Sequence, residues 1–344
     1  MSNKIARKLI TLSLVLILVV VFSLTTDTFL SSRNINELFR VAAYTGLICV
    51  GTSFVLIGGG IDLSAGGVIC FAGVACTRLA CAGVPMIVVV AVAVALAALC
   101  GFINGYLITK FHINDFITTL ATGYVYSGFA LAIILKDASG RVVSQEIKAK
   151  DFLALGKGIN GFSYIAIAWI ILTIVAWYVQ AHTTYGLYTT AIGSNPKSSE
   201  MSGVNIRWMK VSNYVICGAC CGLAAAYTVA YQQTAYLTLG DGMGFSAVAA
   251  CVVGGVVLGG GKGDAIGAFL GALFMTIVSN GMRKYGLDTS WQYVFEGAVI
   301  LVAIIFDAGI GVLTERRLRR LAVISAREEE AKEEELRKAV KTDD

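Results

Sequence analysis

Charged side chains are scarce in this sequence. Asp, Glu, Lys and Arg make up 14% of its 344 residues, against roughly 25% in soluble proteins. The length would suggest two soluble domains. However, hydrophobic residues make up 57%, so there are too few polar side chains to form their water-exposed surfaces, and the chain needs lipid as solvent. The net charge of +5 fits a bias toward the membrane surface. No stretch interleaves basic and aromatic residues, so we expect no nucleic-acid partner.

Histidine and the common catalytic motifs are nearly absent. The two histidines, His112 and His182, fall at predicted helix ends, and no G-x-S-x-G sequence occurs, so an intramembrane serine protease is unsupported. The sequence GGGKGD at 259–264 lacks the Ser or Thr that follows the lysine of a phosphate-binding loop. We therefore expect no enzymatic activity and no bound cofactor here. If ATP and Mg²⁺ drive the protein, a partner ATPase binds them.

Cysteine is present, but in surroundings that do not suit metal or redox chemistry. Nearly all nine cysteines lie within apolar runs. Cys217 and Cys220 have C-x-x-C spacing, but the surrounding VICGACCGLAAA offers no polar residues to support a metal or a reactive thiolate. We interpret the cysteines as small packing residues and predict no metal site.

Long apolar runs are what the sequence has in abundance. A membrane-spanning helix needs roughly 20 such residues, and ten candidates cover 9–26, 40–57, 64–82, 85–109, 114–135, 163–181, 211–234, 243–260, 264–282 and 291–313. A backbone within lipid must satisfy its own hydrogen bonds, so we expect helices. The prediction is an all-α polytopic membrane protein with a transmembrane domain over 1–313 and a charged cytoplasmic tail over 314–344.

The flanking charges predict the orientation. A basic head precedes the first run, as in a signal peptide, but no small-residue cleavage site follows, so we expect an uncleaved helix with a cytoplasmic N-terminus. An even number of crossings then places both termini in the cytoplasm. Before the charged stretch that starts at Arg327, twelve Lys and Arg residues fall on that side and nine on the other, in agreement with the positive-inside rule.

A glycine run separates the apolar runs at 40–57 and 64–82, in LIGGGIDLSAGG. Gly58, Gly59 and Gly60 are expected to break the helix, and Asp62 and Ser64 to lie where a new helix starts. A broken helix at membrane depth is tolerated only where it lines a cavity or is buried in protein. We predict that Asp62 organises a half-helix beside a transport path, with direct substrate contact as its less favoured role.

A second glycine-rich stretch resembles the first. VLGGGKGDAIG at 257–267 aligns with LIGGGIDLSAG at 56–66, and each joins two apolar runs. Internal repeats are common in transporters, although glycine-rich joints alone could produce this match.

Polar groups at membrane depth are costly unless they face a cavity or a partner. Several of those here are neutral hydrogen-bonding groups, which suit a sugar or polyol. The predicted substrate path comprises Asp62, Ser64, Asn104, Phe116, Thr119, Tyr124, Gln232 and Asn280. Further polar candidates are Thr118, Tyr126, Gln233 and Glu296. For each, hydrogen bonding between helices is the alternative.

The loop at about 190–206 predicts a short helix on the cytoplasmic face. Ser194 or Asn195 can cap it, Pro196 suits its first turn and Gly203 can end it. Such a helix is either a docking element for a soluble partner or an ordinary interfacial helix.

Five stretches together resemble the permease subunits of bacterial ATP-binding-cassette importers for ribose, xylose and related sugars. They are GGGIDLSAGG (58–67), GFINGYLITKF (101–111), DFITTLATG (115–123), YTTAIGSNPKSSEMSGVNI (188–206) and AACVVGGVVLGGGKGDAIGAFLGAL (249–273). The resemblance covers roughly residues 40–310. It implies a multi-pass protein of the bacterial inner membrane that transports a monosaccharide or related polyol across that membrane.

The resemblance also implies partners. These are a second permease copy or a sister permease, cytoplasmic ATPase subunits and an extracytoplasmic sugar-binding protein. The family's coupling loop inserts into the ATPase, and the residues that match it here are Ser194, Asn195, Pro196, Glu200, Met201 and Gly203.

The sequence departs from the family pattern in three places. HINDF lacks a proline that is common before the phenylalanine, Ser127 replaces an arginine, and Asp241 stands alone where an acidic pair is common. These differences leave the identity of the sugar open.

An ion-coupled secondary transporter is the alternative function. It should need buried titratable residues, for which Asp62, Glu296 and Asp307 are the candidates. A purely structural membrane protein is disfavoured by the broken helix and by the polar groups at depth.

Overall fold

Helix dominates the structure, as a backbone that must satisfy its own hydrogen bonds requires. The computed structural model describes residues 3–136, 139, 143, 147–159, 162–288, 290–302 and 305. Residues up to Ile300 form one compact unit. The second unit begins at Leu301 and is described at three residues only, so the tail predicted over 314–344 lies outside the described part, as does Asp307.

The elements of the first unit follow in chain order. They are α1 (Asn3–Thr25), α2 (Ser32–Ile57), α3 (Ala65–Cys81), α4 (Met86–Phe111), α5 (Asp115–Ile133), α6 (Lys150–Leu155), β1 (Gly158–Ile159), β2 (Phe162–Ser163), α7 (Tyr164–His182), α8 (Thr184–Ser194), α9 (Pro196–Met201), α10 (Ile206–Gln232), α11 (Met243–Val253) and α12 (Ala265–Lys284). Residues 290–300 are also helical.

Seven of these helices are long and apolar enough to cross a membrane. They are α1, α2, α4, α5, α7, α10 and α12, while α3 and α11 are shorter apolar helices. The short antiparallel pair β1–β2 is the sole sheet among the described residues. The prediction of an all-α polytopic membrane protein is confirmed apart from that pair.

Each of the ten predicted runs contains helix, but several boundaries differ. α2 begins eight residues before the predicted 40–57 because the Ser31 side chain accepts a hydrogen bond from the Asn34 backbone N–H and caps the helix. α10 likewise begins at Ile206 because Asn205 accepts from the Trp208 N–H. The last run, 291–313, is helical at 291–302 and at 305, and its other residues lie outside the described part.

The prediction of one helix over 243–260 is wrong. α11 ends at Val253, and residues 254–264 are irregular. Gly255, Gly260, Gly261 and Gly263 have φ between 71° and 129°, which a right-handed helix cannot contain. At 1.5 Å per residue, eleven residues reach only about 16 Å of a hydrocarbon core about 30 Å thick, so α11 is a half-helix continued by irregular chain.

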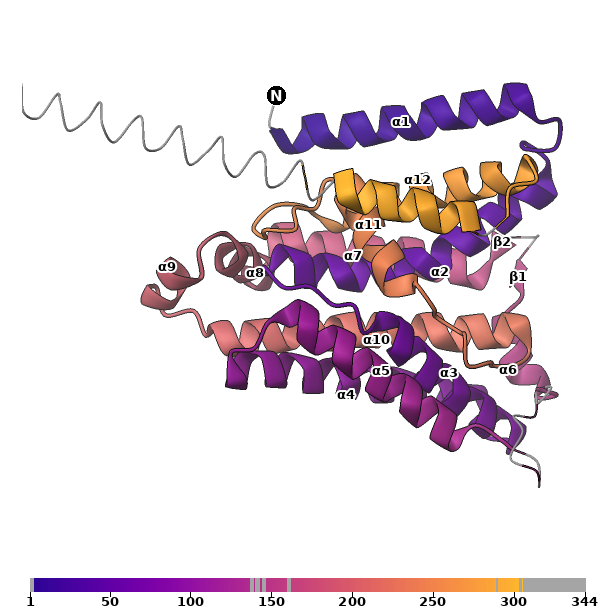
Figure 1. The fold of residues 1–344 in the computed structure, drawn as a ribbon, viewed down its shortest axis with the longest axis horizontal. Helices are drawn as coiled ribbons and strands as arrows, with labels where there is room; N and C mark the ends of the chain where they lie inside the picture. The colour runs from indigo at the N-terminus through magenta and orange to yellow at the C-terminus, as the bar shows by residue number, and fades with distance from the viewer. Residues whose placement is uncertain are drawn as a thin grey trace, which may run out of the picture. The chain divides into compact units, whose positions relative to one another are not determined.

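α10 lies at the centre of the bundle and packs against α2, α3 and α4 (Figure 1). Glycines allow α4 and α10 to approach closely. A Cβ added at Gly105 of α4 would lie 2.7 Å from the Val211 Cα, and one added at Gly222 of α10 would lie 2.6 Å from the Ala93 carbonyl oxygen. Small residues at such contacts are typical of helices that pack within lipid.

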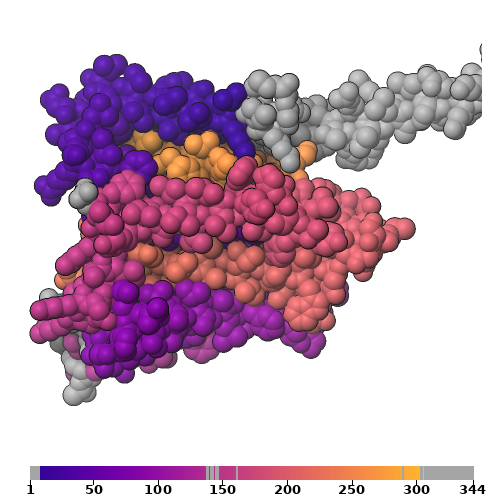
Figure 2. Space-filling view, turned by 180° about the vertical axis from the view of Figure 1, so that it is seen from behind, coloured from indigo at the N-terminus to yellow at the C-terminus, as the bar shows by residue number. Residues whose placement is uncertain are grey.

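Two loop regions mark opposite ends of the bundle. α8 and α9 project at one end, while α6, β1 and β2 lie at the other (Figure 1). Figure 2 shows the α8–α9 region projecting from the bundle as seen from behind. Ten runs that cross the membrane in alternation would place the 190–206 and 136–162 loops on opposite sides, and the described parts of the two regions do lie at opposite ends (Figure 1).

Candidate functional site

The glycine run ends α2 and turns the chain back toward the bundle interior. The N–H groups of Gly58, Gly59 and Gly60 bond to carbonyls of the last turn of α2, and Gly59 has a φ of 74°. Residues 61–64 are then non-helical, and α3 starts at Ala65. Figure 1 shows this segment returning from the α8–α9 end to the middle of the bundle, where α3 continues away from that end. The predicted helix break is present.

A buried polar network surrounds the start of α3. The Asp62 carboxylate accepts from the Ser64 backbone N–H at 2.9 Å and from the Ser64 hydroxyl at 2.6 Å. Asn104 of α4 donates to the Ser64 Oγ at 2.8 Å, and Tyr126 of α5 donates to the Asn104 Oδ1 at 3.0 Å. All four side chains are at most 3% exposed. The network therefore ties the half-helix to α4 and α5.

The extended backbone before α3 is satisfied by neighbouring helices. Thr119 of α5 accepts from the Leu63 N–H at 3.1 Å, and Tyr214 of α10 donates to the Ile61 carbonyl at 3.0 Å. Non-helical backbone at membrane depth needs such partners. These contacts explain why the break is stable inside the protein.

A groove lies beside this network. It has a volume of about 150 Å³ and is lined by Leu63, Gly66, Gly67, Leu120, Gly123, Tyr124, Ser127, Gly240, Asp241, Gly242, Gly244 and Phe245. The starts of α3 and α11 and the middle of α5 thus meet there. The volume is below the roughly 300 Å³ of a typical ligand pocket, so the groove alone does not enclose a drug-sized ligand.

Polar side chains and glycine backbone give the groove its chemistry. Tyr124, Ser127 and Asp241 supply hydroxyl and carboxylate groups, which are hydrogen-bonding partners for polyhydroxy compounds. Gly66 and Gly240 approach each other closely, since a Cβ on Gly240 would lie 2.5 Å from the Gly66 carbonyl oxygen. Backbone groups therefore form part of the groove wall.

The structure brings together some of the predicted path residues and separates others. Asp62, Ser64 and Asn104 form one network, which Thr119 adjoins through the Leu63 N–H, and Tyr124 lines the groove. The others lie elsewhere: Phe116 is 45% exposed on α5, Gln232 ends α10, and Asn280 exchanges amide hydrogen bonds with Asn34 at 3.1 and 3.2 Å.

The remaining polar candidates take part in hydrogen bonds within the chain. Thr118 donates to the Asn114 carbonyl one turn earlier, and the Gln233 carbonyl accepts from the Ile147 N–H. Glu296 accepts from the Ser246 hydroxyl of α11 at 2.6 Å. Ser127 and Asp241 were not among the predicted path residues, although both stand out in the sequence as departures from the family pattern.

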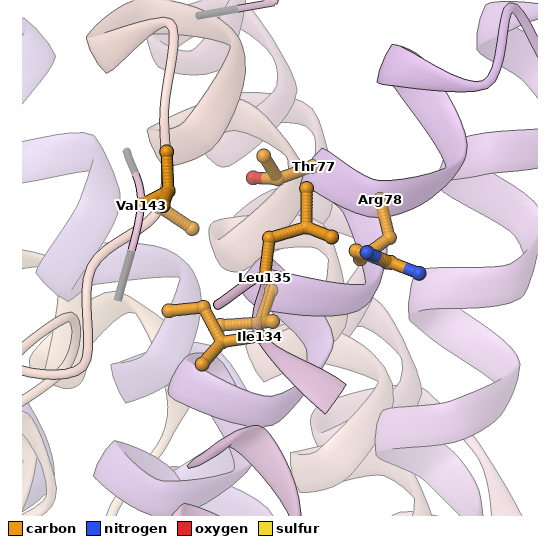
Figure 3. Close-up of a pocket in the computed structure, with 7 residues that line it drawn as sticks. Thr77, Arg78, Ile134, Leu135 and Val143 are labelled. Atoms are coloured by element: carbon orange, nitrogen blue, oxygen red, sulfur yellow. The ribbon is translucent and has the colours of Figure 1, made fainter. Parts of the chain in front are cut away.

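A second, much smaller cavity lies between α3 and the chain after α5. Figure 3 shows residues that line it. Its volume is about 10 Å³, and its walls include Thr77, Arg78, Ile134, Leu135 and Val143. That volume is at the lower limit for one water molecule. We therefore do not assign it a substrate.

The predicted short helix is present as α9. Asn195 accepts from the Ser198 N–H at 3.0 Å, Pro196 occupies the first turn, and Gly203 follows the helix with a φ of 82°. Glu200 and Met201 are exposed. α9 is therefore a short, N-capped helix that projects at one end of the bundle (Figure 1).

Three glycine segments meet where α8 reaches α9. Ile57 is the last residue of α2, and its carbonyl accepts a hydrogen bond from the Gly261 N–H at 2.8 Å. A Cβ on Gly193 of α8 would overlap that carbonyl oxygen and lie 2.6 Å from the Gly261 nitrogen. A Cβ on Gly260 would lie 2.8 Å from the Gly59 Cα. We call these residues (Gly59, Gly193, Gly260, Gly261 and the Ile57 carbonyl) the glycine junction.

The two glycine-rich stretches thus contact each other. Gly59 and Gly260, which occupy aligned positions, both have positive φ values, 74° and 82°. Asp264 caps α12 by accepting from the Gly267 N–H at 2.9 Å and pairs with Lys8 of α1. Gln180 of α7 accepts the Ala265 N–H at 2.7 Å and donates to the Ser53 hydroxyl of α2. The second stretch is therefore fixed by several helices.

Comparison with known proteins agrees with this architecture. Residues 34–304 match the family described as branched-chain amino acid transport system / permease component. The ribose import permease protein of Bacillus subtilis is 32% identical over 85% of this chain and 89% of the relative. The L-arabinose ABC transporter permease protein of Azospirillum brasilense is 31% identical over 85% of each chain. The fructose import permease protein of Rhizobium meliloti is 29% identical over 82% of this chain and 79% of the relative.

No solved structure matches the chain. The family match nevertheless covers more than half of the sequence and includes the broken helix, the groove and α9. The chain therefore belongs to the family of membrane permease components typified by branched-chain amino acid transport systems.

Proposed function

We propose that this chain is the permease subunit of an ATP-binding-cassette importer and that its cargo is a monosaccharide or a related polyol. The observation that carries the proposal is the 32% identity to a ribose import permease protein over 85% of this chain. Relatives described as fructose and L-arabinose permeases are similar over most of their length as well. The comparisons give no support to an ion-coupled secondary transporter.

The groove is the proposed sugar path. Tyr124, Ser127 and Asp241 line it, and the Asp62 network holds the half-helix that forms one wall. Because the groove is small and open, we propose that a second permease, identical or related, covers it and completes the path. A sugar would then meet hydroxyl, carboxylate and backbone groups between two subunits.

The remaining partners are assigned by position. A cytoplasmic ATPase would dock at α9 through Ser194, Asn195, Pro196, Glu200, Met201 and Gly203, and would bind the ATP and Mg²⁺ itself. An extracytoplasmic sugar-binding protein would deliver cargo at the opposite end, near α6 and the β1–β2 pair. The glycine junction would carry motion from α8 and α9 to the half-helices.

Uptake by reconstituted vesicles tests this function. We expect radiolabelled sugar to enter only when the ATPase, the sugar-binding protein and ATP accompany the permease, because this chain has no phosphate-binding loop. Asp241→Ala should lower uptake several-fold while the ATPase still co-purifies, since its carboxylate lines the groove. Uptake that follows an ion gradient without the ATPase would refute the proposal.

The proposed orientation places α9 in the cytoplasm and Lys148 outside. A Cys-free chain with a single cysteine at Lys148 should react with an impermeant maleimide from the outside of intact cells. A cysteine at Glu200, at the opposite end of the bundle, should react only after the membrane is opened. The reverse pattern of labelling would overturn the orientation.

A further inference from the structure

Two cations converge on one tyrosine ring at the α9 end of α4. Lys110 Nζ lies 5.0 Å from the centre of the Tyr106 ring and donates to its hydroxyl at 2.7 Å. The Arg207 guanidinium, from the first turn of α10, lies 5.2 Å from the centre of the same ring. Both cations are exposed. Both positive charges therefore lie at one tyrosine side chain, whose ring attracts cations.

Neither cation has a carboxylate partner within the described residues. The two ion pairs in that part of the chain join Lys8 to Asp264 and Arg40 to Glu37. Asp115, at the start of α5, instead accepts from the Tyr214 hydroxyl. α10 also begins beside Arg207, and the start of a 27-residue helix adds a positive end of the helix dipole. The positive potential near Lys110 and Arg207 therefore favours binding of an anion.

The cations stand at the end of an apolar stripe. Leu99, Phe102 and Ile103 are 37–52% exposed on α4, and at helical spacing they lie on one face with Tyr106 and Lys110. The Phe102 and Tyr106 rings stack at 6.0 Å. α4 is the most apolar of the candidate spans, and most of its residues are not buried. Its outer face therefore suits hydrocarbon chains.

Aromatic side chains at the same level mark a membrane interface. Trp208, beside Arg207, and Phe111, beside Lys110, are each 59% exposed, and the Lys110 ammonium also lies 5.7 Å from the Phe111 ring centre. Tryptophan is enriched where lipid headgroups meet water. The cations and interfacial rings therefore lie where a phospholipid has its headgroup, and the apolar stripe lies where the phospholipid has its acyl chains.

We propose that Lys110, Arg207 and Tyr106 form a binding site for the phosphate of an anionic glycerophospholipid, whose acyl chains lie along Leu99, Phe102 and Ile103. A soluble anion would use the cations but not the stripe, and a protein partner would not need hydrocarbon-facing residues below them. A phospholipid uses both. On the proposed orientation, the lipid belongs to the cytoplasmic leaflet.

Titration of the purified full-length chain with lipid tests the site. The probes are dioleoyl-phosphatidylglycerol, dioleoyl-phosphatidylcholine and inorganic phosphate, and native mass spectrometry counts bound lipid. Each basic residue near an anionic headgroup contributes about 1 kcal/mol. The double variant Lys110→Gln/Arg207→Gln should therefore raise the dissociation constant for phosphatidylglycerol by about 30-fold.

The controls separate this site from general charge effects. Lys148→Gln/Lys150→Gln removes the same charge at the opposite end of the bundle and should leave the affinity within about twofold. Lys110→Arg/Arg207→Lys keeps both charges and should retain most of the binding. Phosphatidylcholine should bind the native chain more weakly than phosphatidylglycerol does.

Three results would overturn the proposal. Unchanged phosphatidylglycerol binding in the glutamine variant would show that the cations do not hold the lipid. Displacement of the lipid by millimolar inorganic phosphate would identify a free-anion site. Loss of ATPase co-purification with lipid binding intact would show that the cluster docks a protein.

Discussion

Gly193→Ala is expected to lower sugar uptake at least tenfold. The added methyl group would overlap the Ile57 carbonyl oxygen and lie 2.6 Å from the Gly261 nitrogen. Both neighbours are backbone atoms, so no side chain can rotate away. The glycine junction must open, and the 2.8 Å bond from the Gly261 N–H to Ile57 is lost. Overpacking of this kind costs about 1–3 kcal/mol.

Gly128→Ala is the matched control. Gly128 lies within α5, and a Cβ there would meet nothing within 4 Å. Alanine is favoured over glycine inside a helix, so this variant should keep full uptake and a thermal unfolding temperature in detergent that is no lower than that of the native chain. Gly193→Ala should lower that temperature. Wild-type uptake by Gly193→Ala would show that the glycine junction is only a loose contact.

A third variant separates docking from transmission. Glu200→Arg reverses a charge on exposed α9 and should reduce co-purification of the ATPase together with uptake. Gly193→Ala leaves the surface of α9 unaltered, so the ATPase should still bind while uptake falls. If both variants lose the ATPase equally, the junction supports docking rather than transmission.

The helical content and the first break could be predicted from the sequence because they depend on local chemistry. Apolar runs must be helical in lipid, and Gly58–Gly60 cannot continue a helix at low cost. The early end of α11 was missed although GGVVLGGGKG at 254–263 contains six glycines. Hydropathy alone extends a run through apolar residues such as Val256 and Leu258, while positive φ values at Gly255 and Gly260 end the helix.

The candidate site was harder to predict than the fold. The position of a polar residue within an apolar run indicates its depth in the membrane. It does not indicate which neighbouring helices the side chain faces. Asn104 and Asn280 are both buried amides, yet one joins the Asp62 network and the other pairs with Asn34. Phe116 and Thr119 are three residues apart on α5 and differ in burial. Asp241 reaches the groove through an irregular segment whose course no periodicity describes.

Asp62→Ala is expected to destabilise the protein by about 3 kcal/mol and to abolish most uptake. Removing the carboxylate leaves the Ser64 backbone N–H without its acceptor and deprives the Ser64 hydroxyl of its 2.6 Å partner. A buried donor without a partner costs about 1–3 kcal/mol. The start of α3 would lose its anchor, and the hydrogen bond from Asn104 to Ser64 would loosen with it.

Asp288 provides a control with the same local geometry. Its carboxylate accepts from the Ser290 backbone N–H at 2.9 Å, two residues on, as Asp62 does from Ser64. Asp288 is exposed, so water can replace the lost acceptor. Asp288→Ala should change the free energy of unfolding by no more than about 0.5 kcal/mol. Equal effects of the two alanine variants would contradict a buried anchoring role for Asp62.

Asp62→Asn separates the hydrogen bonds from the charge. The asparagine Oδ1 can accept from the Ser64 N–H and hydroxyl in the same position, so the network and the half-helix should persist. We expect this variant to keep uptake within about threefold of the native chain and to be more stable than Asp62→Ala, because the oxygen that accepts both hydrogen bonds is retained. ATP-driven vesicle uptake and unfolding in detergent measure the two quantities. A stably folded Asp62→Asn protein without uptake would mean that transport needs the negative charge itself, as direct substrate contact or ion coupling would require.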